Sequence, residues 1–291
     1  MTAPAVPVEG TQVPPPSRRK WTPRKVLNTF LWYASAVVLA LFVIVPIYLI
    51  FVSATTPAEH TYDYPKSLIP TGIDTENIQK FINASGVIDA FWNSVIAGVI
   101  TVVLALGIGA PAGYAIARYA FRGRDGYRLV VLSTRAFPIV ILSIPLAVMY
   151  RSFGIYDTVW GVALMHTALA LPFAVLITAS VFVSIPRELE EAAQTLGCSP
   201  ARAFLRVSLP LALPGLTAAA IFTWVLSWND VFAAAVLTLR NPTLPARILT
   251  SLTQASLPWQ FAAAFVMLVP SLIVIFIIRK YLLGLWGRVV K

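Results

Sequence analysis

Long apolar runs separated by short polar segments make up most of this chain. Four of the runs contain no Asp, Glu, Lys or Arg and are longer than the roughly 20 residues that a helix needs to cross a bilayer. Two further apolar runs carry one charge each, Arg135 in the first and Asp230 in the second. The pattern therefore predicts six membrane-spanning helices, at residues 30–53, 90–117, 129–150, 158–184, 211–239 and 261–283.

Composition strengthens this interpretation. The 291 residues are 58% hydrophobic and only 12% charged, with a mean hydropathy of +0.79, which lies outside the range of soluble globular proteins. We expect an all-α membrane protein whose spanning domain covers residues 30–283. A Pro-rich and then basic tail precedes it at 1–29, and a short tail follows at 284–291. The first span is longer than the apolar region of a signal peptide, so we expect it to remain as an anchor.

The distribution of Lys and Arg predicts the orientation of the spans. With both termini in the cytoplasm, sixteen of the 22 basic residues lie on the cytoplasmic side, five lie outside and Arg135 lies within a span. Cytoplasmic loops are enriched in Lys and Arg, so this orientation is favoured over its inverse. The net charge of +10 then follows from topology and gives no indication of nucleic-acid binding.

One polar stretch, residues 184–210, interrupts the apolar pattern and predicts a short amphipathic helix. Its apolar residues recur at helical spacing on one side, at Leu189, Ala192, Ala193 and Leu196. Charged or amide side chains take the other positions, at Arg187, Glu188, Glu190, Glu191 and Gln194. Gly197 suits a left-handed helix stop, and a second short helix is predicted from Ser199-Pro200. Because its charges are too costly to embed in lipid, we place the stretch in the cytoplasm.

These residues carry a resemblance to a known family. Glu191-Ala192-Ala193, followed by Gly197 and then by Leu209-Pro210, resembles the EAA loop of the membrane-spanning subunits of bacterial ABC importers. The segment Ala115-Ile116-Ala117-Arg118 is similar to a loop of the carbohydrate-uptake, maltose-type permeases, and Trp228-Asn229-Asp230 is similar to part of their fifth span. Leu196 stands where the family usually has Asp. Cys198 stands where it usually has Ala.

The resemblance implies a type I ABC importer permease fold with six spans and a cytoplasmic coupling helix. In that family the coupling helix seats in a cleft of a separate ATPase subunit. The residues carried over to this role are Glu190, Glu191, Ala192, Ala193 and Gly197. The implied partners are a second permease subunit, most simply in a heterodimer, two ATPase subunits and an extracytoplasmic solute-binding protein. The implied location is the bacterial cytoplasmic membrane, in contact with its lipids.

Energy must then come from outside this chain. A Walker phosphate loop needs a Lys directly after a Gly, and none of the six lysines follows a glycine. We therefore expect ATP and Mg to bind to the partner ATPase subunits, and no cofactor in this chain. The sequence also lacks a nucleophile elbow and a His-Glu-x-x-His zinc helix, so we do not expect an enzyme.

A second candidate site lies in the fifth predicted span. Trp224, Trp228, Asn229 and Asp230 combine aromatic rings with an amide and a carboxylate, groups that suit the apolar faces and hydroxyls of a sugar. A carboxylate facing lipid is costly, so a water-filled translocation path is a natural environment for Asp230. The alternative is that Trp228 belongs to an interfacial aromatic belt and that Asn229-Asp230 caps or kinks the helix.

Three other features predict packing rather than chemistry. Ala105, Gly109 and Gly113 form a strip of small residues suited to close contact with another span or with a partner subunit. His166 lies within a span, where we expect a hydrogen-bonded structural role. Cys198 is the only cysteine, which excludes an intramolecular disulfide and a cysteine-rich metal site.

The function predicted from these observations is the permease subunit of an ATP-driven importer of a sugar or polyol. The nearest alternative is a permease for another small solute, such as an amino acid, a peptide or an anion. A stand-alone secondary transporter would be favoured by inverted repeats and several buried ionisable groups, and we find no convincing repeat. A membrane scaffold would need neither a deep Asp nor a proline in every span.

Overall fold

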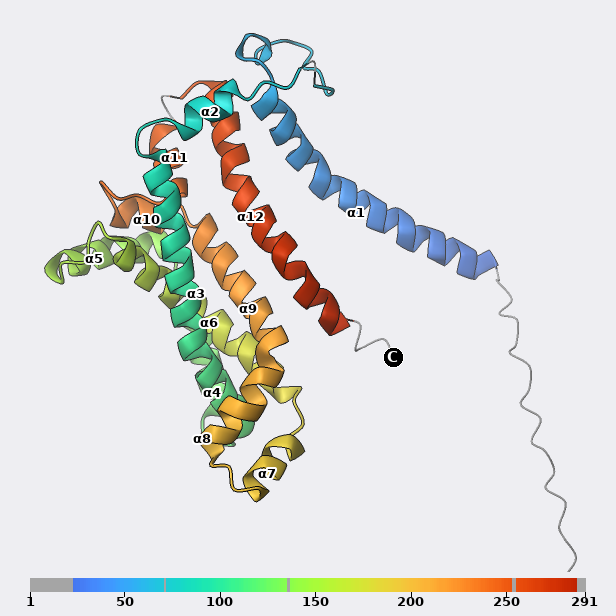
Figure 1. Ribbon diagram of the computed structural model, residues 1–291, viewed down its shortest axis with the longest axis vertical. Coiled ribbons are helices and arrows are strands. Elements are labelled where there is room, and N and C mark those ends of the chain that lie inside the picture. The colour runs from blue at the N-terminus through green and yellow to red at the C-terminus, as the bar shows by residue number, and fades with distance from the viewer. Residues whose placement is uncertain (1–22, 71, 135–136, 253–254, 287–291) are drawn as a thin grey trace, which may run out of the picture. The chain divides into compact units, whose positions relative to one another are not determined.

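A computed structural model describes residues 23–70, 72–134, 137–252 and 255–286, and throughout these ranges the regular structure is helical (Figure 1). Contacts divide the chain into two units, Met1–Leu49 and Ile50–Lys291, so each unit is described by itself. The predicted tail at 1–29 lies outside the described residues up to residue 22. The predicted tail at 284–291 lies outside them from residue 287.

The first unit contains most of one long helix. Helix α1 (Pro23–Thr55) has 33 residues and continues into the second unit. From Leu27 to Thr55 it is apolar enough and long enough to cross a membrane. Most of its large apolar side chains are exposed, Phe42 at 78%. Such a surface is stable where lipid or another protein covers it.

The second unit contains the remaining helices, in an order that follows the predicted alternation of spans and short segments. Their bounds are α2 (Glu76–Ile82), α3 (Val87–Arg118), α4 (Arg124–Ser133), α5 (Ile139–Ser152), α6 (Val159–Val183), α7 (Glu188–Thr195), α8 (Pro200–Ala203), α9 (Leu209–Asn229), α10 (Phe232–Leu237), α11 (Leu244–Ser251) and α12 (Leu257–Trp286). A 3₁₀ turn covers Ala58–His60, and a π-helical turn at Phe204–Ser208 joins α8 to α9. The predicted spans 90–117, 158–184 and 261–283 correspond to α3, α6 and α12.

The predicted span 129–150 is not one helix in this structure. Its first residues, to Ser133, belong to α4 and its last, from Ile139, belong to α5, and Arg135 lies outside the described residues. Pro138 precedes α5 in an extended conformation, with φ −62° and ψ 126°, because its ring disfavours continuation of a helix through it. The 14 residues of α5 extend about 21 Å, less than the roughly 30 Å of a bilayer core.

The predicted span 211–239 also differs from the structure. Helix α9 ends at Asn229, and the separate short helix α10 begins at Phe232. Between them Asp230 has ψ 125°, and its carboxylate accepts a hydrogen bond from the N–H of Ala234 at 3.0 Å. A short acidic side chain that bonds to the backbone ahead of it favours a new helix start over continuation.

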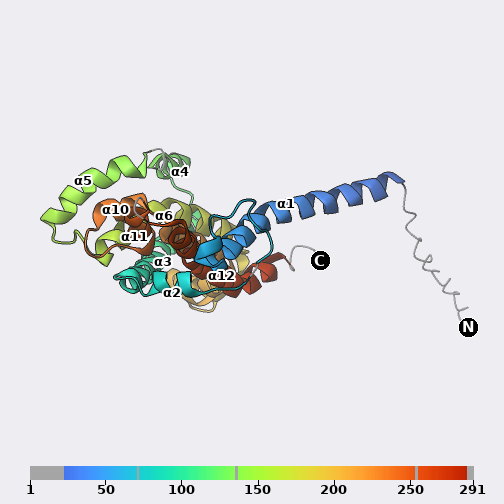
Figure 2. The ribbon, with the colours of Figure 1, turned by 90° about the horizontal axis from the view of Figure 1, so that it is seen from above.

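Helices α3, α6 and α9 pack against one another and form the centre of the second unit (Figures 1 and 2). The predicted small-residue strip lies in the α3–α6 contact. A Cβ added to Gly109 would lie 2.9 Å from the Cβ of Ala174, and one added to Gly113 would lie 2.7 Å from the backbone nitrogen of Ala179. The strip therefore lets two spans of this chain approach closely, which confirms the first of the two predicted packing partners.

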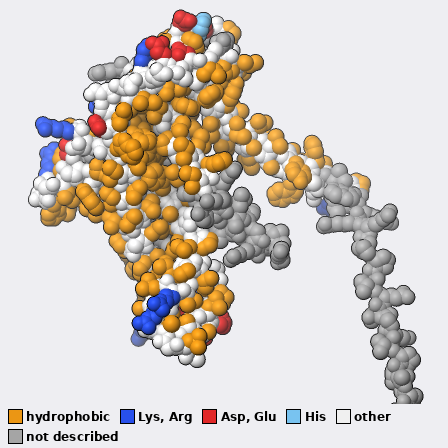
Figure 3. Space-filling model, in the orientation of Figure 1, with side chains coloured by type: hydrophobic (Ala, Val, Ile, Leu, Met, Phe, Trp, Pro, Cys, Tyr) orange, Lys and Arg blue, Asp and Glu red, His pale blue; other side chains and the backbone are white. Residues whose placement is uncertain are grey.

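Polar groups lie towards the two ends of the second unit. On the face shown in Figure 3, charged side chains lie mainly near these ends, and hydrophobic side chains cover most of the surface between them. One end carries α7 and α8, together with the C-terminal end of α3, and the opposite end carries α2 and α11 (Figure 1). The two candidate sites are therefore built at or towards opposite ends of the helices.

Candidate functional site

The polar stretch folds as two short helices separated by a left-handed glycine. Helix α7 is followed by Gly197, which has φ +91°, a conformation that glycine adopts without strain. The N–H of Gly197 bonds to the oxygen of Gln194 at 2.9 Å, and the N–H of Cys198 bonds to that of Ala193 at 3.0 Å. These bonds satisfy carbonyl groups at the end of α7. The helix, the stop and the restart at Ser199-Pro200 are therefore observed where they were predicted.

The predicted apolar stripe of α7 lies largely on the surface. Leu189 is 45% exposed and Leu196 is 87% exposed. Ala192 is also exposed, and Ala193 is half-buried. Glu191 lies among the exposed side chains of this helix. A short helix that leaves its apolar side uncovered presents a surface suited to a partner protein.

Glu190, by contrast, is buried, with 5% of its surface exposed. Its Oε1 accepts a hydrogen bond from Nε of Arg118 at 2.7 Å and forms an ion pair with Nη2 of the same residue at 2.6 Å. Its Oε2 accepts the hydroxyl hydrogen of Tyr114 at 2.7 Å. Glu190 was predicted to contact the ATPase. In this structure its carboxylate is instead directed at α3 of the same chain.

The surroundings of Glu190 stabilise its ionised form. Burial raises the pKa of this carboxyl, but the hydrogen bonds from Tyr114 and Arg118 and the charge of Arg118 outweigh that effect, so the pKa lies below its usual range. Ser208 lies in the π-helical turn, and its Oγ has no partner within hydrogen-bond geometry. A buried carboxylate with an Arg and a Tyr as partners is a strong, directional contact.

Two further contacts attach the loop to the C-terminal end of α3. Arg118 also donates to the carbonyl oxygen of Ile185 at 3.0 Å. Arg187 donates to the carbonyl oxygens of Ala117 and Arg118, at 3.2 and 3.1 Å. Sequence reasoning missed Tyr114 and Arg118 as site residues. The segment that contains Arg118 was noted for its family resemblance, but nothing in the linear pattern pairs it with a residue 72 positions later.

Most side chains predicted to line the translocation path make contacts with other residues of the same chain. Trp228 is 1% exposed, and its Nε1 donates to the carbonyl oxygen of Met267 in α12 at 3.1 Å. Trp224 stacks on Trp228, with ring centroids 5.8 Å apart and an interplanar angle of 14°. Asn229 is exposed, and its Nδ2 donates to the carbonyl oxygen of Val225 at 2.9 Å. Asn229 is therefore the most accessible member of the set.

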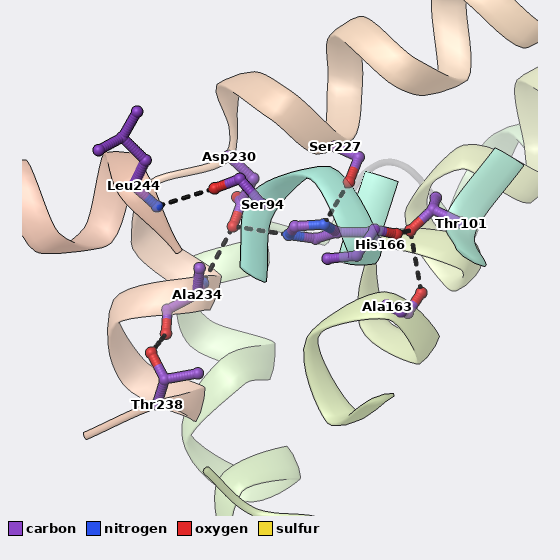
Figure 4. Close-up of polar contacts among 10 residues, drawn as sticks. Ser94, Thr101, Ala163, His166, Ser227, Asp230, Ala234, Thr238 and Leu244 are labelled. Carbon is purple, nitrogen blue, oxygen red and sulfur yellow. Dashed lines mark hydrogen bonds and ion pairs between the residues drawn. The ribbon is translucent and has the colours of Figure 1, made fainter. Parts of the chain in front are cut away.

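Asp230 joins a polar cluster between α6, α9 and α10 (Figure 4). Its Oδ2 lies 3.1 Å from Nε2 of His166, and the other ring nitrogen of His166 lies 2.8 Å from Oγ of Ser227. His166 is fully buried, so both of its nitrogens have partners inside the protein. This is the hydrogen-bonded role that was predicted for His166. For Asp230 the geometry favours the predicted alternative, in which the residue caps and redirects a helix.

A polar pocket of about 440 Å³ lies between the N-terminal end of α3, the loop at residues 240–242 and α11. Its lining includes Asp89, Asn93 and Arg247. The neighbouring loop is held by Asp157, whose Oδ1 accepts three backbone hydrogen bonds at 2.7–3.0 Å, from the N–H groups of Leu239, Arg240 and Asn241. Burial raises the pKa of Asp157, but these bonds and the charge of Arg240 outweigh that effect and lower it below its usual range.

Comparison with known proteins identifies the family. Residues 105–283 match the family described as the binding-protein-dependent transport system inner membrane component. The chain belongs to this family. It is a multi-pass membrane permease subunit of an ABC importer, a transport component and not an enzyme, as predicted. The matched residues include both the α7 loop and the end of α9, so both candidate sites lie within the family's shared region.

Individual relatives cover almost the whole permease. It is 32% identical over 257 residues to the trehalose transport system permease protein SugB of Mycobacterium tuberculosis, covering 86% of this chain and 93% of the relative. It is 30% identical over 266 residues to the diacetylchitobiose uptake system permease protein DasC of Streptomyces coelicolor, covering 88% and 95%.

A solved structure shows the same fold. The permease superposes with a TM-score of 0.70 on a chain of a bacterial ABC transporter involved in the import of the acidic polysaccharide alginate. The match covers 90% of this chain and 99% of that chain at 22% sequence identity, which supports the fold alone. The predicted all-α ABC importer permease fold is therefore confirmed.

Proposed function

We propose that this permease imports a sugar or polyol and that α7 is the coupling helix through which a separate ATPase drives it. The cargo class is supported by the relatives named for trehalose and for diacetylchitobiose, which match along most of this chain. The coupling role is supported by one observation above all: α7 exposes an apolar side while its buried carboxylate attaches it to α3. A helix of this kind can receive a partner without losing its own position.

The docking surface combines apolar and charged groups. Leu189 and Leu196 offer exposed apolar area, and Glu191 offers an exposed charge on the same helix. Apolar burial supplies affinity, whereas charges at the rim of an interface contribute mainly to specificity and association rate. Gly197 and Ala193 fix the turn that ends α7, so their role is to shape this surface rather than to supply its charge.

The complete importer would contain several chains. We infer a second permease subunit, in a heterodimer, and two ATPase subunits that bind ATP and Mg. Both termini and the α7 loop would face the cytoplasm, because the excess of Lys and Arg is on that side. The binding protein required by this family would deliver cargo to the opposite end, where the polar pocket with Asp89 and Arg247 opens.

Cysteine crosslinking tests the coupling role. In a Cys198→Ala background, single Gln194→Cys and Glu191→Cys variants should crosslink to the ATPase in membranes that contain the whole importer. Arg122→Cys, at another exposed cytoplasmic position, is the matched control and should crosslink poorly. Labelling of positions 191 and 194 from outside intact cells by a membrane-impermeant thiol reagent would contradict the proposed orientation.

Transport assays test the cargo. Proteoliposomes that contain the importer and its binding protein should take up a disaccharide such as trehalose in an ATP-dependent manner. Amino acids, peptides and inorganic anions should not compete for this uptake. Competition by one of those solutes, with no effect of sugars, would overturn the cargo class and leave the coupling role intact.

A further inference from the structure

We propose that Tyr114, Arg118 and Glu190 form a joint that transmits movement of α7 to α3, so that Tyr114 and Arg118 are positioning residues of the transport cycle. The proposal rests on the proposed function, in which α7 is driven by an ATPase. It concerns a different step: how force that reaches α7 passes into the membrane helices. We call these three residues the α3–α7 joint.

The joint has a defined geometry. Two nitrogens of Arg118 and the hydroxyl of Tyr114 together occupy both oxygens of Glu190, at distances of 2.6–2.7 Å. A planar guanidinium group that contacts one carboxylate through two of its nitrogens restricts the angle between the groups as well as their separation. Arg118 is tied in addition to Ile185, which lies just before α7. Relative sliding of α7 and α3 would therefore break several bonds together.

Burial makes this contact different from a surface ion pair. The side chains of Arg118 and Glu190 are each only 7% exposed. Exposed pairs exchange readily with water and stabilise little, whereas separation of a buried pair leaves an unpaired charge with little access to water. The joint thus resists opening during movements that would separate a surface pair.

The α3 residues of the joint lie next to the packed core of the permease. Tyr114 and Arg118 are four residues apart in α3, so they share one side of its final turn. Gly113, directly before Tyr114, and Gly109, about one turn earlier, bring α3 into close contact with α6. The Tyr114 ring also packs against Phe182 of α6, with ring centroids 5.4 Å apart. A displacement of the joint is therefore delivered to the packed α3–α6 pair through contiguous contacts.

The adjacent residues Glu190 and Glu191 have different roles in this proposal: Glu190 attaches α7 to α3, and Glu191 belongs to the docking surface for the ATPase. Glu190 is buried and bonded to α3, and Glu191 is exposed. Successive helical residues are about 100° apart around the axis, so one helix can face both its partner and its own chain. This arrangement predicts distinct consequences for substitution of each glutamate, and those consequences can be measured.

The test uses the complete importer in proteoliposomes and measures three quantities: ATPase retained by the permease, ATP hydrolysed, and cargo transported. Tyr114→Phe removes one hydroxyl, and Glu190→Gln removes the charge with little change in shape. Each should retain the ATPase and keep ATP hydrolysis within about twofold of wild type. Cargo transported per ATP should fall at least fivefold for Glu190→Gln and about twofold for Tyr114→Phe.

Further variants distinguish a loss of force transmission from α7 to α3 from a loss of folding. Arg118→Lys keeps the charge and should recover part of the transport per ATP that Arg118→Ala loses. Glu191→Gln should instead weaken retention of the ATPase. Glu188→Gln, at another exposed position of α7, is the matched control and should change neither retention nor transport per ATP. A purely structural role for the joint would reduce the amount of assembled complex and leave transport per ATP unchanged in every variant.

The outcomes distinguish the two proposals. In one outcome, wild-type permease retains the ATPase and transports cargo while the joint variants show unchanged transport per ATP. That result would contradict the role of the α3–α7 joint in transmission and would leave the docking role of α7 supported. If wild-type permease retains no ATPase, the docking role fails and the joint fails with it. A selective loss of transport per ATP, partly restored by Arg118→Lys, supports the joint.

Discussion

The indole nitrogen of Trp228 donates a hydrogen bond to the carbonyl oxygen of Met267, at 3.1 Å, and so joins α9 to α12. Trp228 is also enclosed by the Phe91 ring, at a centroid distance of 5.9 Å, and by Trp224. With these contacts, Trp228 contributes mainly to the stability of the permease. Effects of its removal on transport therefore have to be separated from effects on folding.

Trp228→Phe should lower stability by about 1 kcal/mol or more, because the hydrogen bond is lost and the smaller ring leaves space. Thermal unfolding of the purified permease in detergent measures this change. Asn229→Ala, at the exposed neighbouring position, should leave the unfolding temperature unchanged but reduce cargo uptake if this end of α9 borders the path. Normal uptake by the Asn229 variant would remove it from the translocation path.

The attachment of α7 should weaken in acid. The pKa of Glu190 is lowered in the folded protein, so its contribution is fully present above the ordinary value of 4.5 and is lost as the pH falls through the lower folded-state pKa. The protection factors of the α7 amides, which correct exchange rates for the intrinsic effect of pH, should fall over that interval. In Glu190→Gln these protection factors should already be lower at pH 7 and should show little further change in acid.

Glu191→Gln provides the comparison for this pH experiment. Glu191 is exposed, so its replacement should preserve the acid-dependent loosening of α7. Identical pH profiles for wild type and Glu190→Gln would show that the buried carboxylate does not hold the helix.

The contact between α3 and α6 should not tolerate a methyl group at Gly113. Its Cβ would collide with the Thr178 hydroxyl and lie 2.7 Å from the nitrogen of Ala179, so Gly113→Ala should destabilise the permease by about 1–3 kcal/mol. Gly107→Ala is the matched control in the same helix, because no atom lies within 4 Å of the added Cβ. Thermal unfolding should separate the two variants, and equal unfolding temperatures would contradict the close packing.

The stop of α7 should depend on the conformation of Gly197 and not on its size. No atom lies within 4 Å of an added Cβ, but φ is +91°, which costs most L-residues about 1–2 kcal/mol. Gly197→Asp should alter the turn and reduce transport per ATP while the permease remains in the membrane. Gly197→Asn, which tolerates this conformation better, should retain more transport. Transport by Gly197→Asp at the wild-type level would count against a role of this turn in docking.

The sequence by itself determined the membrane class, the main spans and the two short helices of the polar stretch. Apolar runs of sufficient length identify α3, α6 and α12 because lipid selects for composition along the whole helix. Gly197 and Ser199-Pro200 set the boundary between α7 and α8 because these are local backbone preferences. The EAA resemblance gave the family for the same reason: its residues are contiguous in the chain.

Only the tertiary structure decided which polar side chains face inward. Arg118 meets Glu190, and His166 meets Asp230, across separations of 72 and 64 residues that no helical period encodes. The same packing turned Glu190 away from the predicted ATPase surface and assigned Trp228 to the contact with α12. Periodicity states which side of a helix a residue occupies, but the burial of that side depends on the neighbouring helices.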